Sequence, residues 1–205
     1  YAYGPAPGWP PLVAALTDKP LPAEVVERLI ERCEGIPLFL QECAHLALES
    51  IVMVEEEDCW RLTGSLDELG IPVTLQDFLT AHLDRAGPSK DLAQKASVVG
   101  PYFAAELLER YTGLSRSTLE AHLERLVREE VLLQLELAYA FSHGMLQQAA
   151  YGSLLKSVRQ ECHLKLADTL QAYFPELAES QPEVLAYHYT RGAQLERALE
   201  CWSRA

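Results

Sequence analysis

The stretch of residues 74–155 constrains the fold of this chain most, because four helix-like segments there lead into two short strand-like runs. Thr74 has the residue type of a helix N-cap and is followed three residues later by an acidic residue, as in a variant capping box. Gly100 and Gly113 stand where the second and third segments end, and Ser115 is a candidate N-cap of the fourth. The apolar positions at helical spacing are Leu75, Phe78, Leu79 and Leu83 in the first segment, Phe103, Leu107, Leu108 and Tyr111 in the third, and Leu119, Leu123, Leu126 and Val127 in the fourth.

The two runs that follow, 131–135 and 138–141, flank a turn at Glu136-Leu137. Both are rich in residue types that favour strands. A winged helix-turn-helix domain has this element order: helices come first, the most amphipathic helix is the last of them, and a β-ribbon follows. The sequence therefore predicts a mainly α chain with a winged-helix domain over residues 71–155.

The residues before this domain divide into two parts. Residues 1–20 are rich in Pro and Gly and predict an irregular lead-in. Residues 21–70 predict two helices separated by Gly35-Ile36-Pro37, because Gly commonly ends a helix and Pro commonly starts one. A hairpin is predicted after them, about the acidic turn Glu55-Glu56-Glu57-Asp58. No other acidic pair or His is tied to this turn by spacing, which favours a solvated turn over a metal site.

Residues 156–205 predict helices throughout. A long helical segment runs to Pro175, Ser180 is the candidate N-cap of the next helix, and Gly192 separates that helix from the last one. Two antiparallel helices with Ala and aromatic residues at their contact resemble one unit of a tetratricopeptide-type (TPR) repeat. One such unit cannot bury its own apolar face, so we expect the natural chain to be longer.

Charge and composition argue against two classes of partner. The 205 residues carry a formal net charge of −13 with a sequence pI near 4.9, and so acidic a chain repels nucleic acid phosphate and anionic lipid. No apolar run approaches the roughly 18–20 residues that span a bilayer, and residues 1–7 lack the pattern of a signal peptide. The five cysteines form no C-x-x-C pair and predict buried free thiols in a reducing compartment. We therefore expect a cytoplasmic protein with protein partners.

No catalytic or metal-binding constellation stands out. The histidines form no H-E-x-x-H motif and no paired metal spacing, and the chain has no nucleophile elbow. It also lacks G-x-x-x-x-G-K-[ST], so it cannot hold a nucleoside triphosphate by itself. We expect no catalytic residue, metal ligand or cofactor in this chain alone. The six histidines are His45, His82, His122, His143, His163 and His188.

Five stretches of the chain carry motifs that follow one another in a known order: 34–42, 60–62 with 71–77, 96–103, 141–151 and 188–202. In this order they resemble the STAND class of signalling ATPases (signal transduction ATPases with numerous domains), which are AAA-type ATPases. The resemblance is strongest to the modules attached to bacterial adenylate/guanylate cyclases, protein kinases or LuxR-type transcription regulators, and mammalian soluble adenylyl cyclase is built on a similar plan. The stretch 34–42 is similar to the G-x-P-L-F-x-x-E turn of the class, and 141–151 is similar to its F-x-H-x-x-x-Q-x-x-A-Y pattern.

The resemblance implies a domain assignment for each part of the chain. Residues 21–70 would form a helical lid, 71–155 the winged helix, and 156–205 a helical linker with the first TPR-like helices. The nucleotide-binding core, which holds ATP or ADP with Mg²⁺, would lie before residue 1. The fragment would relay the ADP/ATP state of that core to a helical-repeat arm and to an effector such as a cyclase.

The resemblance also implies three nucleotide-contacting residues. In the class, the proline of the G-x-P turn packs against adenine; here that turn contains Gly35 and Pro37. The winged-helix histidine of the class reaches the β-phosphate of ADP; here it is His143. Class members commonly have Asn where Ile36 stands, so an amide that could orient the turn is missing.

Two alternatives follow from the residues alone: a DNA-binding winged-helix transcription regulator and a protein-binding helical scaffold. The predicted recognition helix, 115–130, carries three arginines against four glutamates, and the strand turn offers Glu136 instead of a basic wing. This balance disfavours specific DNA binding. The charged residues concerned are Arg116, Arg125 and Arg128, and Glu120, Glu124, Glu129 and Glu130.

Overall fold

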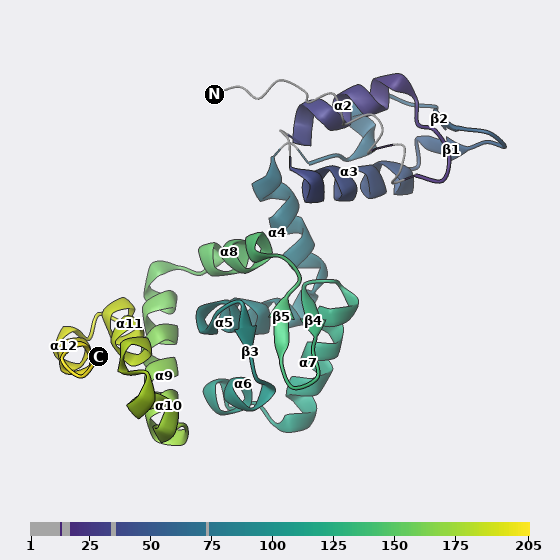
Figure 1. Cartoon of the computed structure of the whole chain (residues 1–205). Coiled ribbons are helices and arrows are strands. Elements are labelled where there is room, and N and C mark those ends of the chain that lie inside the picture. The colour runs from purple at the N-terminus through teal and green to yellow at the C-terminus, as the bar shows by residue number, and fades with distance from the viewer. Residues whose placement is uncertain (1–12, 14–16, 34–35, 73) are drawn as a thin grey trace. The chain divides into compact units, whose positions relative to one another are not determined.

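A computed structural model describes residues 13, 17–33, 36–72 and 74–205, so most of the predicted lead-in, 1–20, lies outside the described residues. The chain divides into two units, residues 1–78 and 79–205, and the division falls within helix α4 (Leu75–Arg85). The mainly α fold is confirmed, with small antiparallel strand pairs between helices (Figure 1). None of the described helices combines the length and apolar character that crossing a bilayer requires.

The first unit is a helix pair followed by a hairpin. Helices α2 and α3 pack against each other and bury Val25, Leu29 and Leu40. Strands β1 and β2 pair antiparallel, so the hairpin predicted about the acidic turn is confirmed. The elements, besides the start of α4, are α2 (Ala23–Cys33), α3 (Pro37–Glu49), β1 (Met53–Glu55), β2 (Trp60–Leu62) and η1 (Leu66–Leu69).

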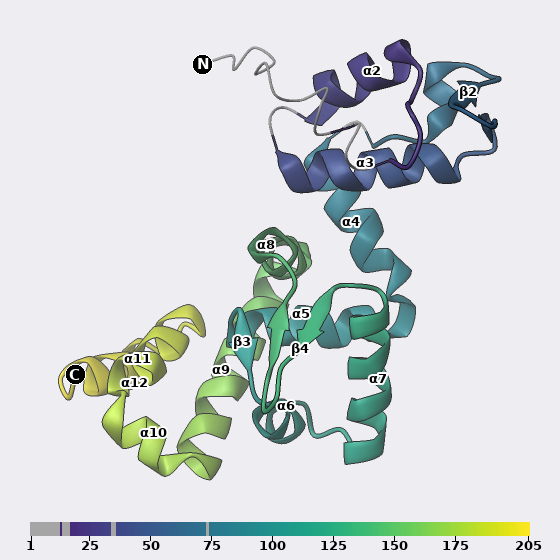
Figure 2. The same ribbon diagram turned by 45° about the vertical axis from the view of Figure 1, so that its right-hand side comes forward.

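The second unit contains a three-stranded sheet of order β3-β5-β4, antiparallel throughout. Along the chain come one helix, one strand, two helices and two strands, and the first of these strands pairs with the last. This is the connectivity of a winged helix (Figure 2). Its core is made of Leu108, Leu119, Leu123, Leu126 and Leu132. The elements are α5 (Lys90–Val99), β3 (Tyr102–Phe103), α6 (Ala105–Thr112), α7 (Arg116–Arg128), β4 (Leu132–Gln134) and β5 (Tyr139–Phe141), with the turn η2 (Gly87–Ser89) before α5.

Strand β3 corrects the sequence prediction, which placed Phe103 in a helix. Gly100 ends α5 at a φ of 144°, and the chain then runs extended beside β5. The backbone N–H of Phe141 donates to the carbonyl of Pro101 over 3.0 Å and extends this pairing. The Phe103 ring packs edge-on against the Phe141 ring, with centroids 6.2 Å apart. The strand exists because of a partner about 40 residues later in the chain, which helical spacing cannot reveal.

Helices complete the second unit: α8 (Gly144–Ser153), α9 (Lys156–Tyr173), α10 (Pro175–Ser180), α11 (Pro182–Arg191) and α12 (Leu195–Trp202). Helix α11 packs against both α9 and α12. The prediction that Ser180 caps α11 was wrong. Ser180 is the last residue of α10, and its hydroxyl donates to the carbonyl of Glu176 over 2.7 Å. Pro175 starts this short helix, as a proline in the first turn can.

The winged-helix core should be sensitive to truncation of α7. Leu123→Ala removes a side chain with no exposed area and should lower the free energy of unfolding of the second unit by about 2–5 kcal/mol. Urea unfolding followed by circular dichroism measures the change. Leu137→Ala, on a side chain that is 92% exposed, serves as the control. Equal effects of the two substitutions would contradict this core assignment.

Candidate functional site

Two of the three residues predicted to contact nucleotide belong to the described residues, one in each unit. Gly35 lies outside the described residues. Pro37 is in the first unit and His143 is in the second. The surroundings of Pro37 and of His143 are therefore described each within its own unit.

The turn before α3 leaves its proline accessible. Ile36 is the N-cap in an extended conformation and provides no side-chain cap, and Pro37 is exposed at the first position of the helix. Two residues later Phe39 is buried against Phe78, with ring centroids 5.6 Å apart. Phe39 thus anchors the helix, while Pro37 is exposed. The N–H groups of the first turn have no acceptor within the helix.

His143 occupies the junction between β5 and α8. It is the N-cap of α8 in an extended conformation, with φ −141° and ψ 139°, and its side chain does not cap the helix. The residue is exposed, and within the described part of the chain its ring has no hydrogen-bond or ionic partner. An imidazole beside the uncapped N-terminus of a helix is a suitable donor to an anion.

The other defined positions of the 141–151 motif all support the fold. Phe141 is buried in the sheet, and Ala150 is buried in α8. The side-chain amide of Gln147 donates to the Ser97 carbonyl of α5 over 2.8 Å. The Tyr151 hydroxyl lies 2.9 Å from Nε2 of His163. Among the five defined positions, only His143 has a side chain that is neither buried nor hydrogen-bonded to another described residue.

The structure brings together two histidines that the sequence did not connect. His163 of α9 and His188 of α11 are buried, and their Nδ1 atoms are 2.8 Å apart. The two residues lie 25 positions apart on different helices, so no spacing rule links them. Helical phase could have placed each one on a buried face, but only packing decides that these faces meet.

Burial keeps this histidine pair neutral. It lowers the pKa of both His163 and His188 from 6.5 to about 4. For His163, the neighbouring His188 and the cations Arg191 and Arg159 lower the pKa further. The remaining histidines have local roles or are exposed: His82 donates from Nε2 to the carbonyl of Glu129, His122 bonds Ser89, and His45 is exposed.

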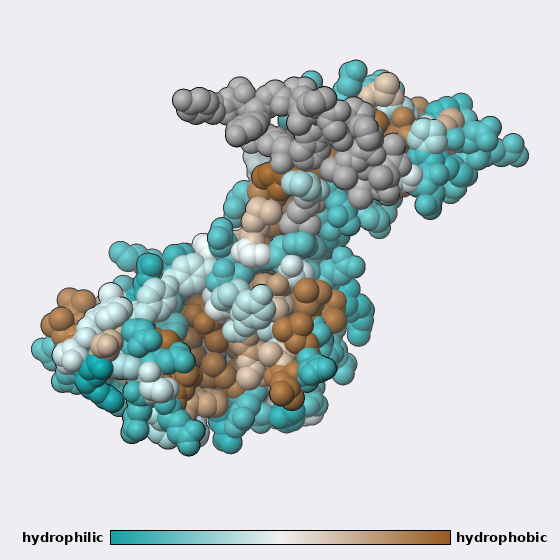
Figure 3. All heavy atoms as spheres, viewed as in Figure 1, coloured by the Kyte–Doolittle hydropathy of each residue, from teal (hydrophilic) through white to brown (hydrophobic). Residues whose placement is uncertain are grey.

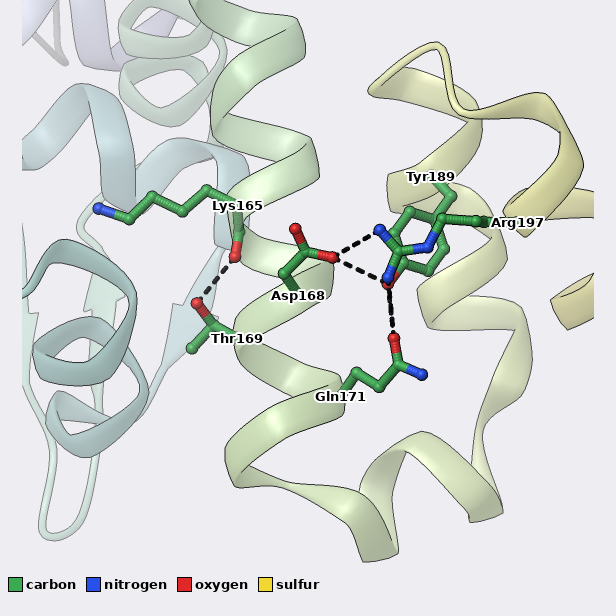
Figure 4. A network of polar contacts seen from close by, with 6 residues as sticks. All are labelled: Lys165, Asp168, Thr169, Gln171, Tyr189 and Arg197. Atoms are coloured by element: carbon green, nitrogen blue, oxygen red, sulfur yellow. Dashed lines mark hydrogen bonds and ion pairs between the residues drawn. The ribbon is translucent and has the colours of Figure 1, made fainter.

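A second polar cluster joins α9, α11 and α12 (Figure 4). Arg197 of α12 pairs with Asp168 of α9 at 2.8 Å and donates to the Tyr189 hydroxyl at 2.5 Å. That hydroxyl lies 2.8 Å from Oε1 of Gln171 and 3.2 Å from the Asp168 carboxylate. Burial raises the pKa of Tyr189 to about 12, so it remains a protonated donor. The cluster holds the α11–α12 hairpin on α9.

Two of the three arginines of α7 have partners within the second unit, and the adjoining wing is apolar. Arg116 pairs with Glu120 and Glu109, and Arg125 donates to the Arg85 carbonyl. The β4–β5 hairpin exposes leucines where DNA-binding wings carry basic residues, and Figure 3 shows apolar surface over this hairpin. These leucines are Leu133, Leu135 and Leu137. The described residues also contain no group of three or more side chains placed to hold a metal ion.

Comparison with known proteins finds a relative among bacterial proteins. An uncharacterised protein of Rhizobium meliloti (strain 1021) is 24% identical over 170 residues, which cover 80% of this chain and 16% of that protein. The chain thus spans a small part of the length of this relative. No protein-family model and no solved structure matches the chain.

The histidine pair predicts an acid-sensitive second unit. The pKa values of His163 and His188 are lowered to about 4 by folding, so between that value and their ordinary pKa the unfolded chain binds more protons. Stability is therefore full above about pH 6.5 and falls as the pH drops toward 4. Urea unfolding at a series of pH values should show this loss, with a smaller slope in His163→Gln/His188→Gln.

The matched control is His45→Gln, which changes an exposed histidine and should keep the wild-type slope. Identical slopes in the double variant and the wild type would show that other groups, such as carboxylates, cause the acid sensitivity.

Proposed function

We propose that this chain is a regulatory part of a nucleotide-switched signalling ATPase of the STAND type. It relays the ADP or ATP state of an upstream P-loop core to a helical arm and an effector such as a nucleotide cyclase, in the cytoplasm. The observation that carries the proposal is His143. It is exposed and unpartnered among the described residues, at the start of α8, within a motif whose other defined positions serve the fold.

The chemistry of the junction fits an anion. A neutral or charged imidazole can donate to a phosphate oxygen, and the first-turn N–H groups of α8 add a partial positive charge. One donor to a charged phosphate is worth about 1.5–3 kcal/mol, which biases a two-state equilibrium by roughly ten- to a hundredfold. Bound ADP with Mg²⁺, held by the core, would therefore favour the arrangement in which His143 reaches it.

The surface of the second unit supports protein partners over nucleic acid. The arginines Arg116 and Arg125 of α7 are engaged within the unit, and the wing is apolar. Helix α12 exposes Leu195, Leu199 and Trp202, which follow one another at helical spacing. An effector or another protein could pack on this face. The same stripe favours a protein-binding helical scaffold as the second candidate function.

Calorimetric titration of ADP and ATP tests the proposal. We expect no binding by the 205-residue chain and binding by a longer natural chain that includes the upstream core. In the longer chain His143→Ala should weaken ADP binding by roughly ten- to a hundredfold and ATP binding less. Gln148→Ala, an exposed change on the same helix, is the control and should bind both nucleotides normally.

Two outcomes would overturn parts of the proposal. If the longer chain binds neither nucleotide, the ATPase assignment fails and the scaffold function takes its place. If the longer chain binds ADP but His143→Ala changes nothing, His143 does not contact the nucleotide.

A further inference from the structure

A row of hydrogen bonds connects three helices of the second unit. The Tyr151 hydroxyl of α8 lies 2.9 Å from Nε2 of His163 in α9. The other nitrogen of the same ring, Nδ1, lies 2.8 Å from Nδ1 of His188 in α11. His163 is thus the middle member, with both ring nitrogens occupied.

A neutral imidazole carries one N–H, and this makes the two hydrogen bonds depend on each other. If His163 is protonated on Nδ1, it donates to His188 and its Nε2 accepts from the Tyr151 hydroxyl. If it is protonated on Nε2, it donates to the Tyr151 oxygen and its Nδ1 accepts from Nδ1–H of His188. The row therefore has two complete arrangements. Reversing the direction of the hydrogen bond at one end also reverses the direction of the hydrogen bond at the other end.

The surroundings disfavour a third, charged arrangement. The His163 ring packs edge-on against the rings of Tyr151 and Tyr187, at centroid distances of 5.7 and 5.8 Å. Arg159 stacks over Tyr151 at 4.5 Å and Arg191 over Tyr187 at 5.4 Å. Two cations and an apolar enclosure oppose the addition of a proton. The row is confined to its two neutral arrangements.

The ends of the row lie on the elements that the proposed function needs to connect. Helix α8 begins after His143 and carries Tyr151 near its other end. Helix α11 carries His188 beside Tyr189, which receives a hydrogen bond from Arg197 of α12. We propose that Tyr151, His163 and His188 form a two-state hydrogen-bond relay that couples α8 to the α11–α12 hairpin. Its role in passing on nucleotide state rests on the proposed function, whereas the relay itself belongs to the 205-residue chain.

Nitrogen-15 NMR of the histidine rings tests the relay in the 205-residue chain, because ring shifts report the tautomer ratio. Tyr151→Phe keeps the ring but removes the hydroxyl. An unpaired buried N–H costs more than an unpaired acceptor, so His163 should shift toward the Nδ1–H form and His188 toward the Nε2–H form. We expect about a fivefold change in the His188 ratio, the worth of one hydrogen bond.

Tyr187→Phe is the matched control, since that tyrosine packs on the same His163 ring and its hydroxyl makes no hydrogen bond among the described residues. It should leave the His188 ratio unchanged. A His188 tautomer that is the same in the wild type and in Tyr151→Phe overturns the relay. So does a change of equal size in both variants, because packing alone would then explain it.

Hydrogen exchange in the longer natural chain separates the relay from the proposed function. ADP should change the exchange rates of the α11–α12 amides in the wild type and in Tyr187→Phe, and Tyr151→Phe should abolish this change. If ADP binds and Tyr151→Phe responds like the wild type, the relay does not transmit the nucleotide state. If ADP does not bind, the proposed function fails, and the tautomer measurement decides the relay.

Discussion

The second unit depends on the double pairing of strand β5. Ala140 lies opposite Leu133 of β4 on one side and opposite Tyr102 of β3 on the other. This pairing closes the sheet over the leucines of α6 and α7 and satisfies backbone groups that would otherwise be buried without partners. Because the chain passes from β5 through Ser142 and His143 directly into α8, the same pairing sets the position of the junction. A weakened β5 would displace both the sheet and the candidate site.

Helix α9 is the second organising element, since two kinds of polar contact start from it. The ion pair of Asp168 with Arg197 is 49% and 41% exposed on its two side chains, and exposed pairs contribute at most about 1 kcal/mol. The row through His163 is buried, where a group left without its partner costs about 1–3 kcal/mol. The buried row therefore does more to hold α8, α9 and α11 in one arrangement, while the ion pair adds orientation to α12.

Within single motifs, some residues are buried and hold the fold together, while others are exposed and free to meet a ligand. In the 141–151 motif, Phe141, Gln147 and Tyr151 make the contacts that place α8, and His143 is left to solvent. Around α3, Phe39 anchors the helix whose first residue, Pro37, is exposed. An exposed residue held by buried neighbours can meet a ligand without paying the entropy of ordering its backbone at that moment. Arg116 and Arg125 of α7 instead have partners within the second unit, which disfavours them as contacts to DNA.

The sequence by itself determined most of the helices, both hairpins and the winged-helix order, because caps, prolines, glycines and apolar spacing act over a few residues. It also located His143 and Pro37 at helix starts, since that depends only on the residues beside them. It did not predict the short helix α10, which ends at Ser180 where a helix start was expected. Tertiary structure alone decided that Phe103 lies in a strand, that His163 meets His188, and that Arg197 reaches Asp168. Each of these joins residues 25 to about 40 positions apart. Such contacts form only where packing brings two helix or strand faces together. The spacing of residues within one segment does not predict which faces will pack against each other.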